Sequence, residues 1–329
     1  MKNIVVIGGG TGTFTVLSAL KQYRDLNLSA IVSMADDGGS TGKLRDELGV
    51  LPPGDVRQCL VALSESDLLM RELFNYRFTN GGLKGHNFGN LFISALEKIT
   101  GGFDSAIDAL EDILKIRGKV VPVTLDKVKL FAEFENGEMM VGEGKIDTSE
   151  NLLSKKVKRF FLSPQGEVNP KAKEVIEKAD YIVIGPGDVY TSIIPNFLVN
   201  NMASFICNAK GKKIYLCNLM TKFGHSDNFS VADFAVEVEK YLGKNCLDYV
   251  IYNDKKPTEE LIKKYARKKE YFVDYNKQDF NSKKYKSIGR DLIGEARHGQ
   301  DKNDEVKRTL IRHNLENLGE VILSIVKEK

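Results

Sequence analysis

The segment "NIVVIGGGTGTFTVLSAL", residues 3–20, places three consecutive glycines directly after a short apolar run. The apolar run is typical of a parallel strand covered on both faces. The residues after the glycines have the pattern of a helix. A strand, a glycine loop and a helix in this order predict a doubly wound sheet, whose ligands bind at the carboxyl ends of the strands.

Similar units continue along the chain. Short apolar runs alternate with helical patterns, and we expect further strands at 28–35, 119–124, 181–187, 212–219, 248–253 and 270–275. This alternation predicts an α/β fold with a Rossmann-like, mainly parallel sheet. A single domain over residues 1–329 is expected.

One segment departs from this pattern. Residues 129–146 alternate with period two about Asn136-Gly137, which predicts an antiparallel hairpin inserted into or beside the main sheet. We therefore expect an elaborated segment at about 125–160.

Composition narrows the function classes. The formal net charge of +3 over 329 residues does not favour a nucleic-acid partner. The basic runs at 155–159 and 263–269 are interpreted as solvated faces, with a polyanion patch as the alternative. No apolar run reaches the ~18 residues of a membrane span. The four cysteines lie far apart without a C-x-x-C pair, so a reduced, cytoplasmic protein is expected.

The first glycine loop is a candidate phosphate site. Gly8 and Gly10 match the dinucleotide pattern, but its third glycine is Thr13. Free N–H groups at a helix start favour anions. A tight turn without a ligand is the alternative. The candidate ligand residues here are Gly9, Gly10, Thr11, Gly12 and Thr13.

The second loop, "ADDGGSTGK" at 35–43, carries two acids where a dehydrogenase has one. A phosphate-loop motif fails, because Leu44 follows Lys43 and Asp37 occupies the position of the required first glycine. Carboxylates, hydroxyls and N–H groups together suit a diphosphate, with or without Mg²⁺. The candidates are Asp37, Ser40 and Thr41.

Other candidates lie at predicted helix starts. Asp55 is expected either to cap its helix, with Gln58 completing a capping box, or to contact a ligand or metal. Arg57 is expected to pair with Asp55 or with a phosphate. The segment 85–102 presents short polar side chains at a helix start and Gly101 at its end. Its candidate ligand residues are His86, Asn87 and Asn90.

A further strand–glycine loop–helix unit occupies 184–196. We expect its helix to run through to Gly211, with Ser192 as the N-cap. Its candidate ligand residues are Gly185, Gly187, Asp188, Tyr190, Thr191 and Ser192. Asn218 and Asn253 follow later strands, where an amide suits a base or sugar; a turn role is the alternative.

Taken together, these motifs resemble the YvcK/CofD-like family, in its gluconeogenesis-factor branch. The matching stretches are "GGGTGT", "ADDGGSTGKLR", "LPPGDVRQCL", "GHNFGNLF", "IGPGDVYTSIIPN", "CNLMT" and "DLIGEARHGQDKNDEVKRTLI". They occur in a consistent order over nearly the whole chain.

The resemblance implies a cytoplasmic regulatory factor that binds UDP-sugars, above all UDP-N-acetylglucosamine. It implies a link between growth on gluconeogenic carbon sources, cell shape and cell-wall precursor synthesis, with Tyr265 and Arg297 at the UDP-sugar. A protein partner in amino-sugar or cell-wall synthesis and a homo-oligomer are kept open. The CofD branch implies the alternative, a phospho-lactate-type transferase. Its Mg²⁺ carboxylates would be Asp37 and Asp55.

Overall fold

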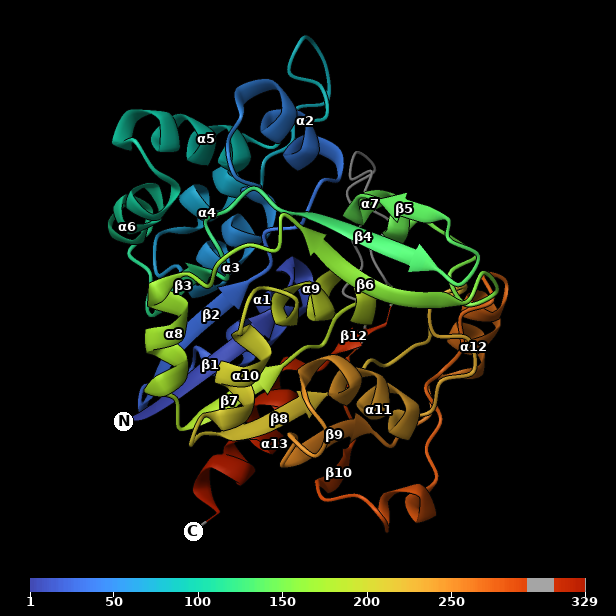
Figure 1. Ribbon diagram of the computed structural model, residues 1–329. Helices are drawn as coiled ribbons and strands as arrows, with labels where there is room; N and C mark the ends of the chain where they lie inside the picture. Colours follow the sequence, from blue (N-terminus) through green and yellow to red (C-terminus); the bar gives the residue numbers. More distant parts are fainter. Residues whose placement is uncertain (295–310, 329) are drawn as a thin grey trace.

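A computed structural model describes residues 1–294 and 311–328. Its centre is a seven-stranded sheet in the order β10-β9-β8-β7-β1-β2-β3, and every neighbouring pair is parallel (Figure 1). The strands are β1 (Lys2–Gly8), β2 (Leu26–Val32), β3 (Lys119–Pro122), β7 (Tyr181–Ile184), β8 (Lys212–Leu216), β9 (Tyr249–Asn253) and β10 (Lys286–Arg290). The predicted Rossmann-like parallel sheet is confirmed.

The strand order reverses between β1 and β7. From β1 the chain builds outward through β2 and β3, whereas β7 pairs with the other side of β1 and the chain then builds through β8, β9 and β10. The connections after β1 and β7 therefore run to opposite sides of the switch, although the two loops begin side by side. Such a reversal opens a crevice at the carboxyl edge of the sheet, the usual ligand position in doubly wound folds.

Helices cover both faces of the sheet (Figure 1). One face carries α1 (Gly10–Leu20), which packs against α3 (Gly54–Leu63) and α13 (Leu315–Lys327). The other face carries α8 (Pro170–Glu177), α9 (Ile194–Phe197), α10 (Met202–Asn208) and α11 (Val231–Leu242). Between these layers Ile4, Val6 and Ile7 of β1 have no exposed surface, which explains the unbroken apolar run.

The connection from β2 to β3 is the longest excursion on the β2 side of the switch. It contains α3 and four further helices, which Figure 1 shows grouped beyond β2 and β3. These are α2 (Gly39–Leu48), α4 (Leu68–Asn75), α5 (Phe88–Thr100) and α6 (Phe103–Ile113). The short elements elsewhere are α7 (Glu143–Asp147), a π-helical turn η1 (Val189–Ile193), α12 (Glu259–Ala266), η2 (Lys277–Phe280), β11 (Ile293–Gly294) and β12 (Arg312–His313).

The predicted hairpin is confirmed. β4 (Lys129–Phe134) pairs antiparallel with β5 (Met139–Val141), and the turn closes through hydrogen bonds between Phe134 and both Gly137 and Glu138. Gly137 has φ +84°, which favours glycine. A third strand, β6 (Val157–Ser163), pairs with the other edge of β4 and was not predicted. Its polar, outward-facing Lys158 and Arg159 hide the strand pattern.

Two other expectations are wrong. The run at 270–275 forms no strand of the main sheet; only Phe272 makes an isolated bridge, to Met220. The seventh strand is instead β10, an edge strand whose Lys286 and Arg290 break the apolar pattern. The helix expected from Ser192 to Gly211 is divided into η1, α9 and α10, and its N-cap is Asp188.

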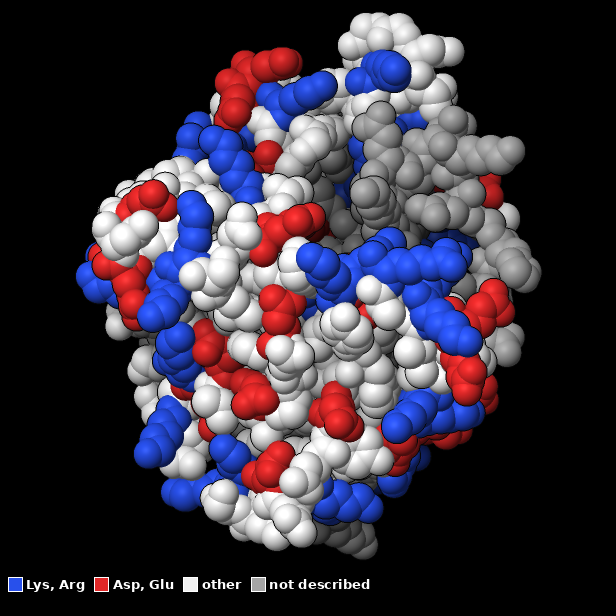
Figure 2. All heavy atoms as spheres, turned by 90° about the vertical axis from the view of Figure 1, so that its right-hand side faces the viewer, with Lys and Arg blue, Asp and Glu red and all other residues white. Residues whose placement is uncertain are grey.

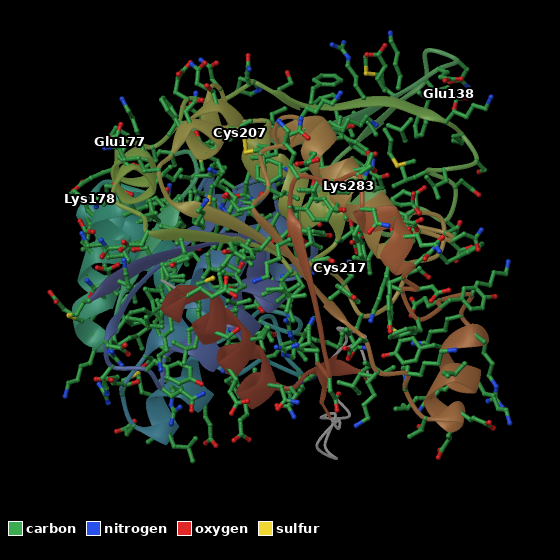
Figure 3. All side chains as sticks on the ribbon, turned by 90° about the horizontal axis from the view of Figure 1, so that it is seen from below. Glu138, Glu177, Lys178, Cys207, Cys217 and Lys283 are labelled. Carbon is green, nitrogen blue, oxygen red and sulfur yellow. A yellow bond between two sulfur atoms is a disulfide. The ribbon has the colours of Figure 1, made fainter. Side chains whose placement is uncertain are left out.

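The cysteines also differ from the expectation of four unpaired thiols. Cys207 on α10 and Cys246 after α11 form a disulfide, with their Cα atoms 5.4 Å apart. Figure 3 labels Cys207 of this pair and also Cys217, which directly follows β8. Cys59 and Cys217 are free and buried, where a cysteine packs as a small apolar residue.

The two basic runs are exposed, as both of their interpretations require. Residues 155, 156, 158 and 159 and residues 263, 264 and 267–269 are exposed. Lys158 and Arg159 both pair with Glu133, at 2.6 Å. Figure 2 shows Lys and Arg side chains gathered across the middle of the face that lies to the right in Figure 1. No helix within the described residues is long and apolar enough to cross a membrane.

Helix α11 offers a test of the local folding rules away from the crevice. Ser230 caps it in a reciprocal capping box with Asp233, in which each side chain accepts from the other residue's N–H. Replacing Ser230 by alanine is expected to lower the free energy of unfolding by about 1 kcal/mol. Chemical denaturation followed by circular dichroism measures it. The exposed Ser282→Ala control should change stability little, and an equal loss in both variants would contradict the capping role.

Candidate functional site

The glycine loop after β1 packs against the loop after β7. A Cβ atom on Gly12 would lie 1.8 Å from the carbonyl oxygen of Pro186, and one on Gly9 would lie 3.0 Å from the Cβ and Oγ of Ser192. Glycine is therefore required at Gly12 for close approach of two backbones. The two loops that the sequence singled out therefore lie side by side at the β1–β7 switch, where doubly wound folds have their ligand crevice.

Asp55 belongs to the first turn of α3, but its side chain reaches the start of α1 and does not cap α3. The N-cap of α3 is Pro53, without a side-chain cap, so the expected capping box is wrong. Instead the Asp55 carboxylate accepts the N–H of Gly10, and Gln58 accepts a hydrogen bond from the Thr11 hydroxyl at 3.1 Å. The Asp55 carboxylate thus occupies part of the N-terminus of α1, where the sequence predicted a phosphate.

The two neighbouring acids of the second loop face different surroundings. Asp37 accepts the N–H of Gly144 at 2.7 Å, and its carboxylate lies 3.9 Å from the Arg45 guanidinium. Asp36 accepts the N–H of Gly38 at 2.9 Å and acts electrostatically on Asp55. The structure therefore brings Asp36, not Asp37, beside Asp55. Sequence reasoning noted both acids but selected only Asp37.

Several carboxyl groups converge on this part of the crevice. Burial, and then the neighbouring Asp36, raises the pKa of Asp55 to about 8. Burial, and then Asp36, also raises the pKa of Glu143 on α7 to about 10. Burial raises the pKa of Asp36 as well. Glu143 was not predicted, because only the fold brings the inserted segment here. Among residues 1–294 and 311–328, no three His, Cys, Asp or Glu side chains form a group that could hold a metal ion.

Helix α5 starts as predicted and adds a polar wall. Asn87 caps it by accepting the N–H of Asn90 at 3.1 Å, and Gly101 ends it with φ +78°. The Ser40 hydroxyl lies 3.3 Å from Nδ1 of His86, and the Asn90 amide lies 3.5 Å from the Thr41 hydroxyl. The structure thus brings together the candidates from the second loop and from 85–90.

Arg57 links this wall to α4. Its side chain is buried and donates to Oδ1 of Asn90 at 2.9 Å and to the backbone oxygen of Phe74 at 3.2 Å. It also donates to Oδ1 of Asn75 at 2.7 Å. The Arg57 guanidinium therefore links α4 to α5. The sequence had predicted a different partner, either Asp55 or a phosphate.

The Asp188 carboxylate binds several groups in and beside the loop after β7. Its Oδ1 accepts the N–H groups of Tyr190 and Thr191, each at 3.0 Å. Its Oδ2 lies 3.0 Å from Nζ of Lys222 and 3.1 Å from Nδ1 of His225. Burial raises the pKa of the Asp188 carboxyl, but Lys222 and His225 outweigh burial and hold this pKa well below its usual range.

The inserted segment, which contains α7 and β6, contacts the same loop after β7. Asp147 on α7 accepts from the Thr191 hydroxyl at 3.1 Å and from Lys222 at 2.5 Å. Tyr190 stacks on Phe160 of β6, with ring centroids 4.8 Å apart. Asn218 accepts the N–H of Gly187 at 3.1 Å and so connects the segment after β8 to the loop after β7.

The remaining candidates have other positions. Both ends of the Asn253 amide are engaged by the chain, with the Lys255 carbonyl and the Leu292 N–H. Tyr265 is buried, and its hydroxyl accepts the N–H of Ile311 at 2.8 Å. Arg297 lies outside the described residues.

The parallel sheet and the loops at the β1–β7 switch define a Rossmann-like α/β protein, and comparisons with known proteins identify its family. A family model described as 2-phospho-L-lactate transferase CofD matches residues 4–293. The gluconeogenesis factor of Bacillus subtilis is 36% identical over 99% of this chain and 98% of its own length. That of Listeria innocua is 40% identical over 91% of this chain and 92% of its own length. The chain therefore belongs to the CofD-like family, in its gluconeogenesis-factor (YvcK-like) branch.

A solved structure agrees with this assignment. The crystal structure of a UPF0052 family protein from Bacillus halodurans superposes with a TM-score of 0.89 at 37% identity. The match covers 98% of this chain and 100% of the other.

Proposed function

We propose that the chain is a regulatory factor that binds UDP-N-acetylglucosamine in the crevice at the β1–β7 switch. In this function it links gluconeogenic growth to cell-wall precursor synthesis and cell shape. The convergence of two glycine loops and the Ser40–His86 wall on one crevice carries the proposal. A diphosphate is large enough to contact donors from more than one of these segments, and Ser40 and His86 supply partners for sugar hydroxyls.

The internal capping by Asp55 and Asp188 shapes this proposal. Because Gly10, Tyr190 and Thr191 already donate to carboxylates, the diphosphate uses neighbouring donors, such as the exposed Thr11 and the backbone N–H groups at the start of α2, residues 39–41. Acidic groups nearby favour a ligand accompanied by a cation or rich in hydroxyl donors. A UDP-sugar meets both conditions better than a bare phosphate does.

A thermal-shift panel of UDP-N-acetylglucosamine, GDP and NADH tests the proposal. At a ligand concentration near 100 Kd, the UDP-sugar should add about 2.7 kcal/mol to the free energy of unfolding. The half-buried His86, replaced by alanine, should weaken binding about tenfold, or about 1.4 kcal/mol. The exposed Lys84→Ala on the same loop is the matched control. Absence of a shift with any UDP-sugar would refute the proposal.

The position of Asp36 beside Asp55 favours one alternative function, an Mg²⁺-dependent phospho-lactate-type transferase. The matching family model is described by an enzyme of this kind. Mg²⁺ in phosphoryl-transfer sites is often held by one or two carboxylates together with substrate oxygens, so this pair fits it. The ion would neutralise phosphate charge during transfer. Asp36 and Asp55 would hold it, whereas the Gly144 N–H and Arg45 already engage Asp37.

Isothermal titration with Mg²⁺ and GDP separates these assignments. If the transferase alternative holds, Asp36→Asn and Asp55→Asn should abolish Mg²⁺ binding, and Asp37→Asn should preserve most of it. Unchanged Mg²⁺ affinity in Asp36→Asn and Asp55→Asn would exclude these carboxylates as the metal site.

A further inference from the structure

We infer that the edge of the main sheet carries a second ligand site, which takes a nucleoside monophosphate. A pocket of about 510 Å³ lies where β9 and β10 meet the segment that contains η2. None of the ten residues that line it belongs to the crevice. Two strand positions separate β9 from β7, which corresponds to roughly 10 Å along the sheet. The site is therefore additional to the proposed UDP-sugar site.

Aromatic rings from two elements form the wall of the pocket. The rings of Tyr252 on β9 and Tyr275 before η2 have centroids 4.7 Å apart, and Phe280 lies 5.5 Å from Tyr252. Tyr252 and Phe280 are buried, whereas Tyr275 is half-buried. A partly exposed ring at the edge of an aromatic cluster offers a face on which a planar base can stack.

A glycine keeps this wall open. Gly289 on β10 stands directly opposite Tyr252 in the parallel register. A Cβ atom there would lie 3.0 Å from the Tyr252 hydroxyl and 2.9 Å from Oδ2 of Asp254. Without a side chain at Gly289, the phenol and the carboxylate lie close to the backbone of β10 and remain part of the pocket lining.

Charges of both signs surround the aromatic wall. Asp254, Lys277 and Arg290 line the pocket, and all three are exposed. A carboxylate accepts hydrogen bonds from a ribose diol, and a guanidinium binds phosphate through two parallel bonds. A nucleoside monophosphate is the class of ligand that uses the aromatic rings, the carboxylate and the cationic side chains at once. An inorganic anion would leave the rings and Asp254 without a role, and a nucleoside would leave the two cations without one.

Titration calorimetry on the full chain tests this site with AMP, UMP, dAMP, adenosine and inorganic phosphate as probes. AMP or UMP should bind one site per chain, and inorganic phosphate should bind far more weakly. Arg290→Ala should weaken AMP binding about tenfold and leave adenosine binding unchanged. Asp254→Asn should remove the preference for AMP over dAMP. The exposed Arg267→Ala, outside the pocket lining, is the matched control.

The inference would be overturned by no binding of either monophosphate at millimolar concentration, by equal binding of AMP and inorganic phosphate, or by equal AMP affinity in wild type and Arg290→Ala. A competition experiment keeps the two sites apart. AMP binding that survives in His86→Ala and in the presence of UDP-N-acetylglucosamine belongs to the edge pocket. AMP binding that is lost in His86→Ala or displaced by the UDP-sugar belongs to the crevice and also overturns the inference. Failure of UDP-sugar binding alone leaves the edge site standing.

Discussion

Replacing Gly12 by alanine is expected to lower the free energy of unfolding by about 3 kcal/mol or more. The added Cβ would lie 1.8 Å from the Pro186 carbonyl oxygen and 2.7 Å from its carbonyl carbon. Both are backbone atoms, so no side chain can rotate to make room. The substitution must separate the loop after β1 from the loop after β7, and overpacking of this kind ranks among the costliest point changes. Denaturant unfolding followed by far-ultraviolet circular dichroism measures the loss.

Gly82→Ala is the matched control for this substitution. A Cβ on Gly82 meets no atom within 4 Å, so its effect should stay within about 0.5 kcal/mol. Because Gly12 lies in a wall of the crevice, the Gly12 variant should also lose the thermal shift with UDP-N-acetylglucosamine. Equal stability of the two variants would show that the loops after β1 and β7 are not in close contact.

The sequence was sufficient to predict the parallel sheet and the hairpin. Strand β1 is buried on both faces, so its four central apolar residues carry the signal without interruption. The Asn136-Gly137 turn requires positive φ only at the glycine, a preference that is local. Features with a local cause were therefore recognisable, and among them was the start of α5 at Asn87.

The errors have non-local causes. Asp55 and Gln58 satisfy a capping-box pattern, but the tertiary fold offers Asp55 the N–H of Gly10 instead. The role of Asp37 stays a prediction; its sequence neighbours did not indicate that α7 docks on it, with the Gly144 N–H donating to its carboxylate. Similarly, β10 is an edge strand, where charged side chains can reach solvent, and its short polar sequence resembles that of a loop.

Replacing Lys222 by methionine is expected to cost about 2 kcal/mol at neutral pH. The change removes the cation 3.0 Å from Asp188, whose side chain is only 12% exposed, and leaves that carboxylate with His225 and two N–H donors. Breaking a fully buried pair costs roughly 3–5 kcal/mol. Because the Lys222 side chain is one-third exposed, water screens part of the attraction and the expected loss is smaller.

A surface pair supplies the control for this prediction. Lys178 and Glu174 form an ion pair at 2.5 Å, with side chains 68% and 55% exposed, and Figure 3 shows Lys178 at the periphery of the molecule. Lys178→Met should therefore change the free energy of unfolding by no more than about 0.5 kcal/mol. If it costs as much as Lys222→Met, the loss reflects lysine removal in general and not the charge pair with Asp188.

The pH dependence identifies Asp188 as the group that Lys222 stabilises. A carboxyl whose folded pKa is depressed contributes stability that is complete above its unfolded pKa, about 3.9, and is lost as pH falls towards the folded value. Lys222→Met removes part of that depression. The gap between wild type and variant should therefore be full above about pH 5 and should narrow below about pH 4. In an Asp188→Asn background the same substitution should cost much less, because the pair is already broken. A gap that stays constant with pH would assign the effect to packing of the lysine stem. Equal costs in both backgrounds would assign it to that packing or to the second ion pair of Lys222, with Asp147.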